Sequence, residues 1–402
     1  MSDLASILSI NAGSSSLKFA LHPVQAGVAQ AASLLGQIEG LEPGGELSLS
    51  WHGEHGLAQQ KLAAGADSAD PFDIALAALQ TLLHSWPTLG ALRAVVHRVV
   101  HGGELFRDAL QVDAAVLEKL RSLQPLAPLH QPHNIAGIDA FMRFFPQLPQ
   151  IACFDTAFHA SLPEVAYRFA LPQALSQQGI RRYGFHGLSY QSISQSLQAV
   201  SARAKGRVLM AHLGNGASLC ATVEGASCAT TMGFSTLDGL MMGSRCGALD
   251  PGVILHLLAQ GWSAEQLQDT LYKRSGLLGV SGITADMRRL RQSDAPEAQL
   301  ALRMFAARVV HEAGALVADM GGIDILSFSA GIGEHDVVLR QQVCLALGFL
   351  GVQLDQAKNS AADGSQVQAL HADGSAVEVW LVPTDEGRVA AQAALELLGA
   401  EI

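Results

Sequence analysis

The sequence predicts an α/β protein made of two duplicated halves. Strand-like apolar segments alternate with helix-like segments along 402 residues, a length that exceeds the usual size of one hydrophobic core. A strand-turn-strand pattern near the N-terminus returns about two hundred residues later. A proline-rich break at residues 145–149 separates the two copies, so we expect a domain boundary there.

The repeated pattern is a hairpin whose turn consists of small residues. Its first copy covers residues 7–21 and its second covers residues 208–223. A shift of 202 residues places Ser16-Leu17 on Ser218-Leu219 and overlays the two turns. Because this shift is about half the chain length, it indicates a duplication.

The remaining elements follow from periodicity and helix-ending signals. Apolar residues at spacings of three and four predict helices over 71–85, 301–320 and 387–398. Gly321-Gly322 is expected to end the second of these helices. Apolar runs predict strands at 151–154, directly after the break, and at 323–328.

Composition favours a soluble cytoplasmic enzyme. No apolar run reaches the ~18 residues that span a bilayer, and Met1-Ser2-Asp3 lacks the basic region of a secretory signal. A net charge of −11 argues against non-specific nucleic-acid binding. The five cysteines form no CxxC pair, which favours reduced thiols over disulfides or a zinc site. We therefore expect neither a membrane nor a nucleic acid as a partner.

A turn, a strand and a strand end carry residues that suit anions, although each also has a plain structural interpretation. The turn 11–18 has small residues and a lysine that can approach phosphate, but ordinary serine-rich turns look the same and Lys18 is equally consistent with a surface charge. Arg98 interrupts an apolar strand, where it is either a core ion pair or an anion ligand. Asp155 follows an apolar strand, where α/β proteins bind ligands, with a helix N-cap as the alternative.

Three later segments add to this pattern. His186 lies in a glycine-flexed turn, with a structural histidine as the alternative, and Arg245 lies between glycines in a predicted loop. The segment 330–335 offers a glycine pair for a base or ribose, a weak signal by itself. Taken together, these groups predict phosphoryl transfer, in which the protein supplies positioning and charge stabilisation. No GxxxxGK[ST] loop or protein-kinase signature is found in the sequence, so another nucleotide-binding fold is expected.

The chain resembles the acetate kinase family from Ile7 to Glu386. The motifs that carry the resemblance are NAGSSSLK at 11–18, HRVVHGG at 97–103, APLH at 127–130, FDTAFH at 154–159, RYGFHG at 182–187, HLGNGAS at 212–218, MGFSTLDGLMMGSR at 232–245, SGLLGVSG at 275–282 and GIGE at 331–334. The resemblance implies duplicated actin-like (ribonuclease H-like) domains, an ATP cleft between them, and a homodimer. The implied domains are 1–150 with 386–402, and 151–385.

The resemblance also implies roles for individual residues. Asn11 and Glu386 would hold Mg²⁺, for which Mn²⁺ is a possible substitute, and Arg98 would bind the substrate carboxylate. The catalytic residues would be Asp155, usually called the acid/base, together with His186 and Arg245. The substrate pocket would be completed by Val100, Leu129, His130, Phe185 and Thr236. The site for ATP or ADP would be lined by Lys18, His212, Leu213, Gly214, Asn215, Gly216, Asp286, Met287, Arg288, Gly331, Ile332, Gly333, Glu334 and His335.

Some residues depart from the commonest family pattern. Thr236 stands where the family commonly has proline, and His335 where it commonly has asparagine. Gln131, Ala229 and Ala248 also differ, and none of these changes removes a catalytic group.

The implied reaction is reversible, direct transfer of the ATP γ-phosphoryl group to acetate. A carboxyl group has a pKa of about 4.3, so acetate is already ionised and needs no general base. We therefore expect Asp155 to orient an arginine or a magnesium-bound water. A propionate or other short-chain carboxylate kinase is the nearer alternative, and a polymerising or chaperone-like ATPase the more distant one.

Overall fold

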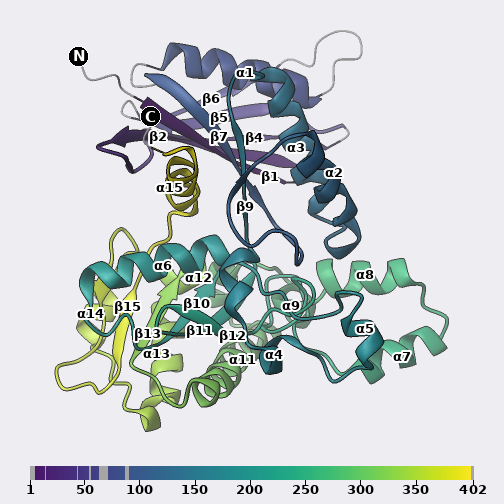
Figure 1. Ribbon diagram of the computed structural model, residues 1–402. Helices are drawn as coiled ribbons and strands as arrows, with labels where there is room; N and C mark the ends of the chain where they lie inside the picture. Colours follow the sequence, from purple (N-terminus) through teal and green to yellow (C-terminus); the bar gives the residue numbers. More distant parts are fainter. Residues whose placement is uncertain are drawn as a thin grey trace. The chain divides into compact units, whose positions relative to one another are not determined.

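The computed structural model describes residues 5–13, 15–42, 44–53, 56–62, 71–86 and 90–399 (Figure 1). Met1-Ser2-Asp3 and Ser14, both used in the sequence analysis, lie outside these residues. The chain divides into a first unit, Met1–Ala157 with Asp385–Ile402, and a second unit, Phe158–Thr384. The first boundary therefore lies after Ala157, a few residues beyond the predicted one at 150, because the strand Gln150–Phe154 pairs within the sheet of the first unit.

The first unit contains one mixed sheet in the order β6-β5-β4-β2-β1-β7-β9-β8, with β3 beside β2. Its strands are β1 (Ala5–Ala12), β2 (Ser16–Gln25), β3 (Val28–Ala29), β4 (Leu34–Glu39), β5 (Ser48–Gly53), β6 (Gly56–Lys61), β7 (Ala91–Val99), β8 (Leu110–Gln111) and β9 (Gln150–Phe154). Its helices are α1 (Pro71–Ser85), α2 (Ala114–Ser122), α3 (Gln131–Phe144) and α15 (Glu386–Leu398), with a 3-10 turn at Gln124–Leu126.

Helices cover both faces of the central strands in this unit (Figure 1). Leu8 and Ile10 of β1 belong to the core that α1 and α3 complete. Ser9, between them, points to the other face, where it approaches Gly387 of α15. This alternation explains why β1 is buried along most of its length, as is usual for a parallel central strand.

The second unit contains a six-stranded sheet in the order β12-β11-β10-β13-β15-β14. Its strands are β10 (Arg207–Leu213), β11 (Ala217–Val223), β12 (Ala226–Thr230), β13 (Ile325–Ser329), β14 (Gln368–Ala369) and β15 (Glu378–Leu381). Its helices are α4 (Glu164–Tyr167), α5 (Gln173–Ser176), α6 (Gly187–Val200), α7 (Pro251–Ala259), α8 (Ala264–Lys273), α9 (Gly276–Ser281), α10 (Met287–Arg291), α11 (Pro296–Met320), α12 (Ala330–His335), α13 (Val337–Ala346) and α14 (Gln356–Ala361). Two 3-10 turns lie at Ala157–Ser161, where the units meet in sequence, and Gly348–Leu350.

The two sheets repeat the same strand order, which confirms the predicted duplicated α/β architecture. In the first sheet the antiparallel hairpin β1–β2 is followed on one side by antiparallel β4 and on the other by parallel β7 and β9. In the second sheet the hairpin β10–β11 has antiparallel β12 on one side and parallel β13 and β15 on the other.

The predicted helices are all present, with small shifts at their ends. α1 has the predicted bounds, whereas α11 starts at Pro296, five residues before the predicted start, because proline fits the first turn of a helix. Gly321 ends α11 in the left-handed conformation with φ of 70°. Residues 330–335, which offered the glycine pair for a base or ribose, form the short helix α12. No helix in the described part of the chain is long and apolar enough to cross a bilayer.

Candidate active site

Three predicted site residues lie at one edge of the first sheet. β1, β7 and β9 are parallel neighbours, so their carboxyl ends meet at the same edge. The register pairs Ile10 with His97, which makes Asn11 and Arg98 the next residues along. Asp155 directly follows β9, and its backbone N–H donates to Val99 O.

Arg98 makes a two-pronged ion pair with Asp155 at this edge. Arg98 Nε lies 3.0 and 3.2 Å from the two carboxylate oxygens, and Nη2 lies 2.6 Å from Oδ2. The carboxylate of Asp155 is only 3% exposed, while the Arg98 side chain is 23% exposed. Arg98 Nη1 donates no hydrogen bond to any described residue. Arg98 therefore forms a core ion pair with Asp155 and still has N–H groups available for an anion.

Glu386, the first residue of α15, extends this group. Its Oε2 lies 3.7 Å from Arg98 Nε. Burial alone would lower the pKa of Arg98, but the charges of Asp155 and Glu386 raise it above its ordinary value, so the guanidinium stays charged. Asp385 caps α15 by accepting from Arg388 N at 2.9 Å. The cap fixes the start of the helix at Glu386.

The donor set at this edge fits a hydrated magnesium ion. The Asn11 side chain makes no hydrogen bond to another described residue, and Glu386 is in contact with Arg98 only at a long distance. Mg²⁺ usually takes one or two protein carboxylates and fills the rest of its shell with water and phosphate oxygens. Asn11 and Glu386 therefore have the oxygen donors that the ligands implied by the resemblance would need.

The second unit holds His186 in an unusual backbone conformation. His186 has φ of 60° at the start of α6 and is preceded by Gly184, which also has a positive φ of 75°. A side chain on Gly184 would come within 2.5 Å of the His159 ring, so this turn requires glycine. The turn stacks the His186 ring on that of His212, with centroids 4.1 Å apart. His186 Nδ1 lies 2.8 Å from Ser218 Oγ.

The turn after β10 brings His186 and Arg245 together. A β-carbon on Gly216 would lie 3.5 Å from His186 Nε2 and 3.7 Å from Arg245 Nη1. Arg245 lies in the long connection before α7, as predicted for a loop, and its Nη1 donates to Thr236 O at 3.1 Å. Two donor side chains beside a glycine backbone are well suited to the charge of a phosphoryl group in transfer.

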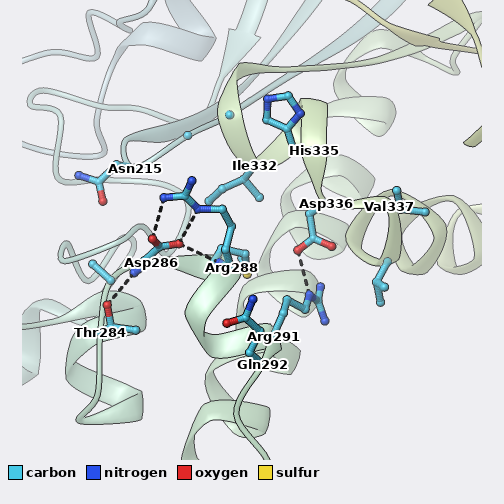
Figure 2. Close-up of a pocket in the computed structure, with 15 residues that line it drawn as sticks. Asn215, Thr284, Asp286, Arg288, Arg291, Gln292, Ile332, His335, Asp336 and Val337 are labelled. Carbon is cyan, nitrogen blue, oxygen red and sulfur yellow. Dashed lines mark hydrogen bonds and ion pairs between the residues drawn. The ribbon is translucent and has the colours of Figure 1, made fainter. Parts of the chain in front are cut away.

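A cavity of about 990 Å³ lies in the second unit and is lined by many of the predicted nucleotide residues (Figure 2). These are Gly214, Asn215, Asp286, Met287, Arg288, Gly331, Ile332 and His335. The cavity is large enough for a nucleotide, since ligand pockets typically occupy about 300–1,000 Å³. The same cavity is also lined by residues that the sequence analysis missed: Thr284, Ala285, Arg291, Gln292, Asp336, Val337 and Val338.

Two ion pairs shape the wall of this cavity, as Figure 2 shows. Arg288 Nη2 lies 2.8 Å from Asp286 Oδ2, and these hydrogen bonds lower the pKa of Asp286 to about 2. Arg291 Nε lies 2.9 Å from Asp336 Oδ2. Asp336 also caps α13 by accepting from Leu339 N at 2.9 Å, and an acidic residue before an apolar helical run is a signal that could have found it.

Several predicted nucleotide residues do not line the cavity. Lys18 belongs to the first unit, where it is exposed and pairs with Asn11 across the hairpin. His212 and Leu213 are buried at the end of β10, and Gly216 lies beside His186. The others are Gly333 and Glu334 on α12.

The predicted acyl-pocket residues are shared between the units. Val100, Leu129 and His130 belong to the first unit, where Val100 N donates to Asn134 Oδ1 at 3.0 Å. Phe185, which is 1% exposed, and the half-buried Thr236 belong to the second.

A fully buried arginine supports α12 and was not predicted. Arg340 of α13 donates to Gly333 O and Glu334 O at 3.0 and 2.6 Å, and to Asn359 Oδ1 at 2.7 Å. Its positive charge therefore sits against the carbonyl end of α12, where a helix favours a cation.

Known proteins resemble this chain over nearly its whole length. Residues 6–392 match the family model of the acetokinase family. The chain is 48% identical over 393 residues to the acetate kinase of Rhodopseudomonas palustris, and the alignment covers 96% of each sequence. Its structure matches that of Porphyromonas gingivalis acetate kinase with a TM-score of 0.88 and 33% identity, covering 98% of this chain and 100% of the other.

A structure of a propionate kinase from Francisella tularensis subsp. tularensis matches equally well. Its TM-score is 0.88 with 34% identity, and the match covers 97% of this chain and 98% of the other. Both matches are consistent with the mixed α/β architecture of this chain, since each covers at least 97% of it. The family model and the full-length identity show that this chain belongs to the acetokinase family.

Proposed function

We propose that this chain is a kinase that reversibly transfers the γ-phosphoryl group of ATP to acetate, giving acetyl phosphate and ADP. The observation that carries the proposal is Arg98, held by a buried carboxylate at a strand end while part of its guanidinium stays available for an anion. The family match and the nucleotide-sized cavity of the second unit support it. The proposal keeps the cytoplasmic location that the composition predicts.

In the proposed reaction, Arg98 binds the acetate carboxylate and orients one oxygen toward the γ-phosphorus. That oxygen forms the new P–O bond while the bond to the β–γ bridging oxygen breaks, so ADP leaves with the negative charge. The reaction needs no proton transfer, because acetate is ionised at neutral pH. His186 and Arg245 would stabilise charge on the transferring phosphoryl oxygens. Mg²⁺, when bound through Asn11 and Glu386, would neutralise phosphate charge.

Asp155 acts as a positioning residue in this proposal. Its two oxygens are in contact with Arg98 Nε and Nη2, which fixes the plane of the guanidinium. A carboxylate engaged in this way stays ionised and favours orientation of Arg98 over proton abstraction.

A coupled assay of ADP formation tests the proposal directly. Acetate, propionate, butyrate or no acid is added to the enzyme with ATP and Mg²⁺. We expect rates to depend on acid and to be highest with acetate. ATP hydrolysis that is independent of any carboxylate would contradict a carboxylate kinase and favour an ATPase. Higher kcat/KM with propionate would favour the second candidate, a propionate kinase, which the 34% identity to the Francisella protein supports.

Val100→Ala is expected to shift selectivity toward propionate by about tenfold, because one methylene in an apolar pocket is worth about 1–3 kcal/mol. Val100 stands two residues after Arg98, directly after the end of β7, and is buried. The ratio of kcat/KM for acetate and propionate is measured in both proteins. An equal fall for both acids would mean that Val100 only packs in the core.

The proposal includes a homodimer, and α7 offers a surface for a second copy. None of the residues of α7 is buried. Leu255 is 67% exposed, and Val253, Leu258 and the preceding Leu249 are each about two-fifths exposed. Several exposed apolar side chains on and beside one helix are typical of interaction surfaces in soluble proteins.

Leu255→Asp is expected to convert the dimer to a monomer, because it places a charge in the centre of an apolar interface. Light scattering after size-exclusion chromatography measures the mass. Leu57→Asp is the matched control, since Leu57 is 78% exposed on β6 of the first unit. A dimer that survives Leu255→Asp would place the interface elsewhere.

A further inference from the structure

We propose that Tyr190 and Ser218 form a hydroxyl relay that fixes the tautomer of His186 and so presents its Nε2–H toward the Arg245 side. Both are positioning residues that act through His186. The inference rests on the proposed phosphoryl transfer and assigns a function to buried hydroxyl groups that the motif itself does not explain.

Ser218 lies between the two groups that it connects. Its Oγ is 2.8 Å from His186 Nδ1 and is also hydrogen-bonded to Tyr190 Oη. Ser218 comes from β11 and Tyr190 from α6, and both are fully buried. Among the described residues, Ser218 is the hydrogen-bond partner of the Tyr190 hydroxyl.

The direction of the hydrogen bonds follows from the chemistry of Tyr190. Burial raises the pKa of Tyr190 well above its ordinary value, so the phenol keeps its proton. A buried hydroxyl that fails to donate costs about 1–3 kcal/mol, so this proton is directed to Ser218 Oγ. Ser218 then directs its own proton to His186 Nδ1. A neutral imidazole that accepts at Nδ1 carries its proton on Nε2.

The nitrogen that carries this proton faces the backbone where charge is expected to develop. A β-carbon on Gly216 would be 3.5 Å from His186 Nε2 and 3.7 Å from Arg245 Nη1, so both groups lie beside the backbone of Gly216. An Nε2–H there adds a donor to the one from Arg245. The other tautomer would present a lone pair to the same phosphoryl oxygens and repel them.

The other groups around His186 are compatible with the neutral ring. His212 stacks on it, with its Nδ1 2.7 Å from Ser189 Oγ. His159 Nε2 lies 3.0 Å from the backbone O of Phe185, the residue before His186. Burial lowers the pKa of His159 to about 4, which keeps the His159 ring neutral. A positive charge on His186 would lie close to the charge of Arg245.

Tyr190→Phe tests the relay because it removes only the first donor. Ser218 Oγ can then accept from His186, so the neutral ring also populates the Nδ1–H tautomer. At pH 8 we expect kcat to fall about tenfold, with KM for ATP and acetate changed less than about twofold. Below the pKa of His186, the ring carries a proton on both nitrogens, so the choice of tautomer no longer matters. The ratio of variant to wild-type kcat should then rise several-fold.

Tyr183→Phe is the matched control on the same turn. The Tyr183 hydroxyl donates to Gly179 O at 2.8 Å and is not part of the relay. Its activity ratio to wild type should not vary with pH. A pH-independent ratio for Tyr190→Phe, or the same pH-dependent ratio for Tyr183→Phe, would overturn the relay.

A spectroscopic measurement separates this inference from the proposed function. In ¹⁵N-histidine-labelled enzyme, the signals of His186 are assigned by their loss in His186→Asn, and their shifts report which nitrogen carries the proton. We expect Nε2–H in the wild type and a mixture in Tyr190→Phe. If that variant does not fold, Ser218→Ala replaces it with the same expectation. Nδ1–H in the wild type would overturn the relay whether or not the enzyme phosphorylates acetate.

Discussion

Arg98→Ala is expected to lower kcat/KM for acetate by about a hundredfold or more, which is the usual cost of removing a charge contact to the reacting groups. It should also destabilise the protein. The substitution leaves the carboxylate of Asp155, 3% exposed, without the guanidinium that now compensates it. Breaking a buried ion pair in this way typically costs about 3–5 kcal/mol. Steady-state kinetics and thermal melting should therefore both change.

A second substitution separates the two effects. In Arg98→Ala/Asp155→Asn the carboxylate charge that lost Arg98 is also removed, so the melting temperature should partly recover while activity stays low. Arg98→Lys keeps a positive charge but cannot reproduce the two parallel N–H contacts with Asp155, so it should remain well below wild-type activity. If Arg98→Ala retained more than about a tenth of wild-type kcat/KM, Arg98 would have no role in binding the carboxylate.

The edge that holds Arg98 could be predicted because it depends on local patterns and one rule of sheet geometry. Apolar runs predicted β1, β7 and β9, and parallel neighbours place their final residues at one edge. The ion pair itself was left open, since the sequence around Arg98 is equally consistent with a core pair and a ligand. The distances to Asp155 and Glu386 show that Arg98 pairs with both carboxylates.

The helix α12 could not be predicted because its support lies far along the chain. Residues 330–335 contain two glycines, which locally favour a loop. The structure holds them in a helix through Arg340 and through Asn359, which anchors that arginine. Neither of these contacts has a periodic signal. Tertiary contacts therefore outweigh local propensity here.

Motif membership was also a poor guide to the lining of the cavity. Leu213 belongs to the HLGNGAS motif but is buried at the end of β10, a strand buried on both faces, while Gly214 and Asn215 immediately after it line the cavity. Arg291, by contrast, is outside all the motifs and reaches the cavity because α10 carries it there. The relay from Tyr190 to Ser218 joins two elements that no local pattern links.

Arg245→Ala is expected to reduce kcat by about a hundredfold or more while changing KM for acetate only a few-fold, because the lost contact is made to the transferring phosphoryl group. The variant also loses the hydrogen bond from Nη1 to Thr236 O, so the melting temperature is measured beside the kinetics to separate a loss of folded protein from a loss of catalysis. Arg245→Lys should restore only part of the activity, because an ammonium group lacks the planar fork of guanidinium. A large rise in KM with unchanged kcat would instead assign Arg245 to ground-state binding.

Arg274→Ala provides the matched control for this prediction. Arg274 is an arginine near the same connection, since the following Ser275 N donates to Ser244 O at 2.9 Å. Its side chain is 61% exposed and pairs with Asp269 at 2.7 Å, a surface contact worth at most about 1 kcal/mol. We therefore expect Arg274→Ala to keep wild-type kcat, KM and melting temperature. Equal losses of activity in both variants would mean that any substitution in or near this connection impairs the enzyme. A loss confined to Arg245→Ala identifies the Arg245 guanidinium as the group that acts on the phosphoryl oxygens.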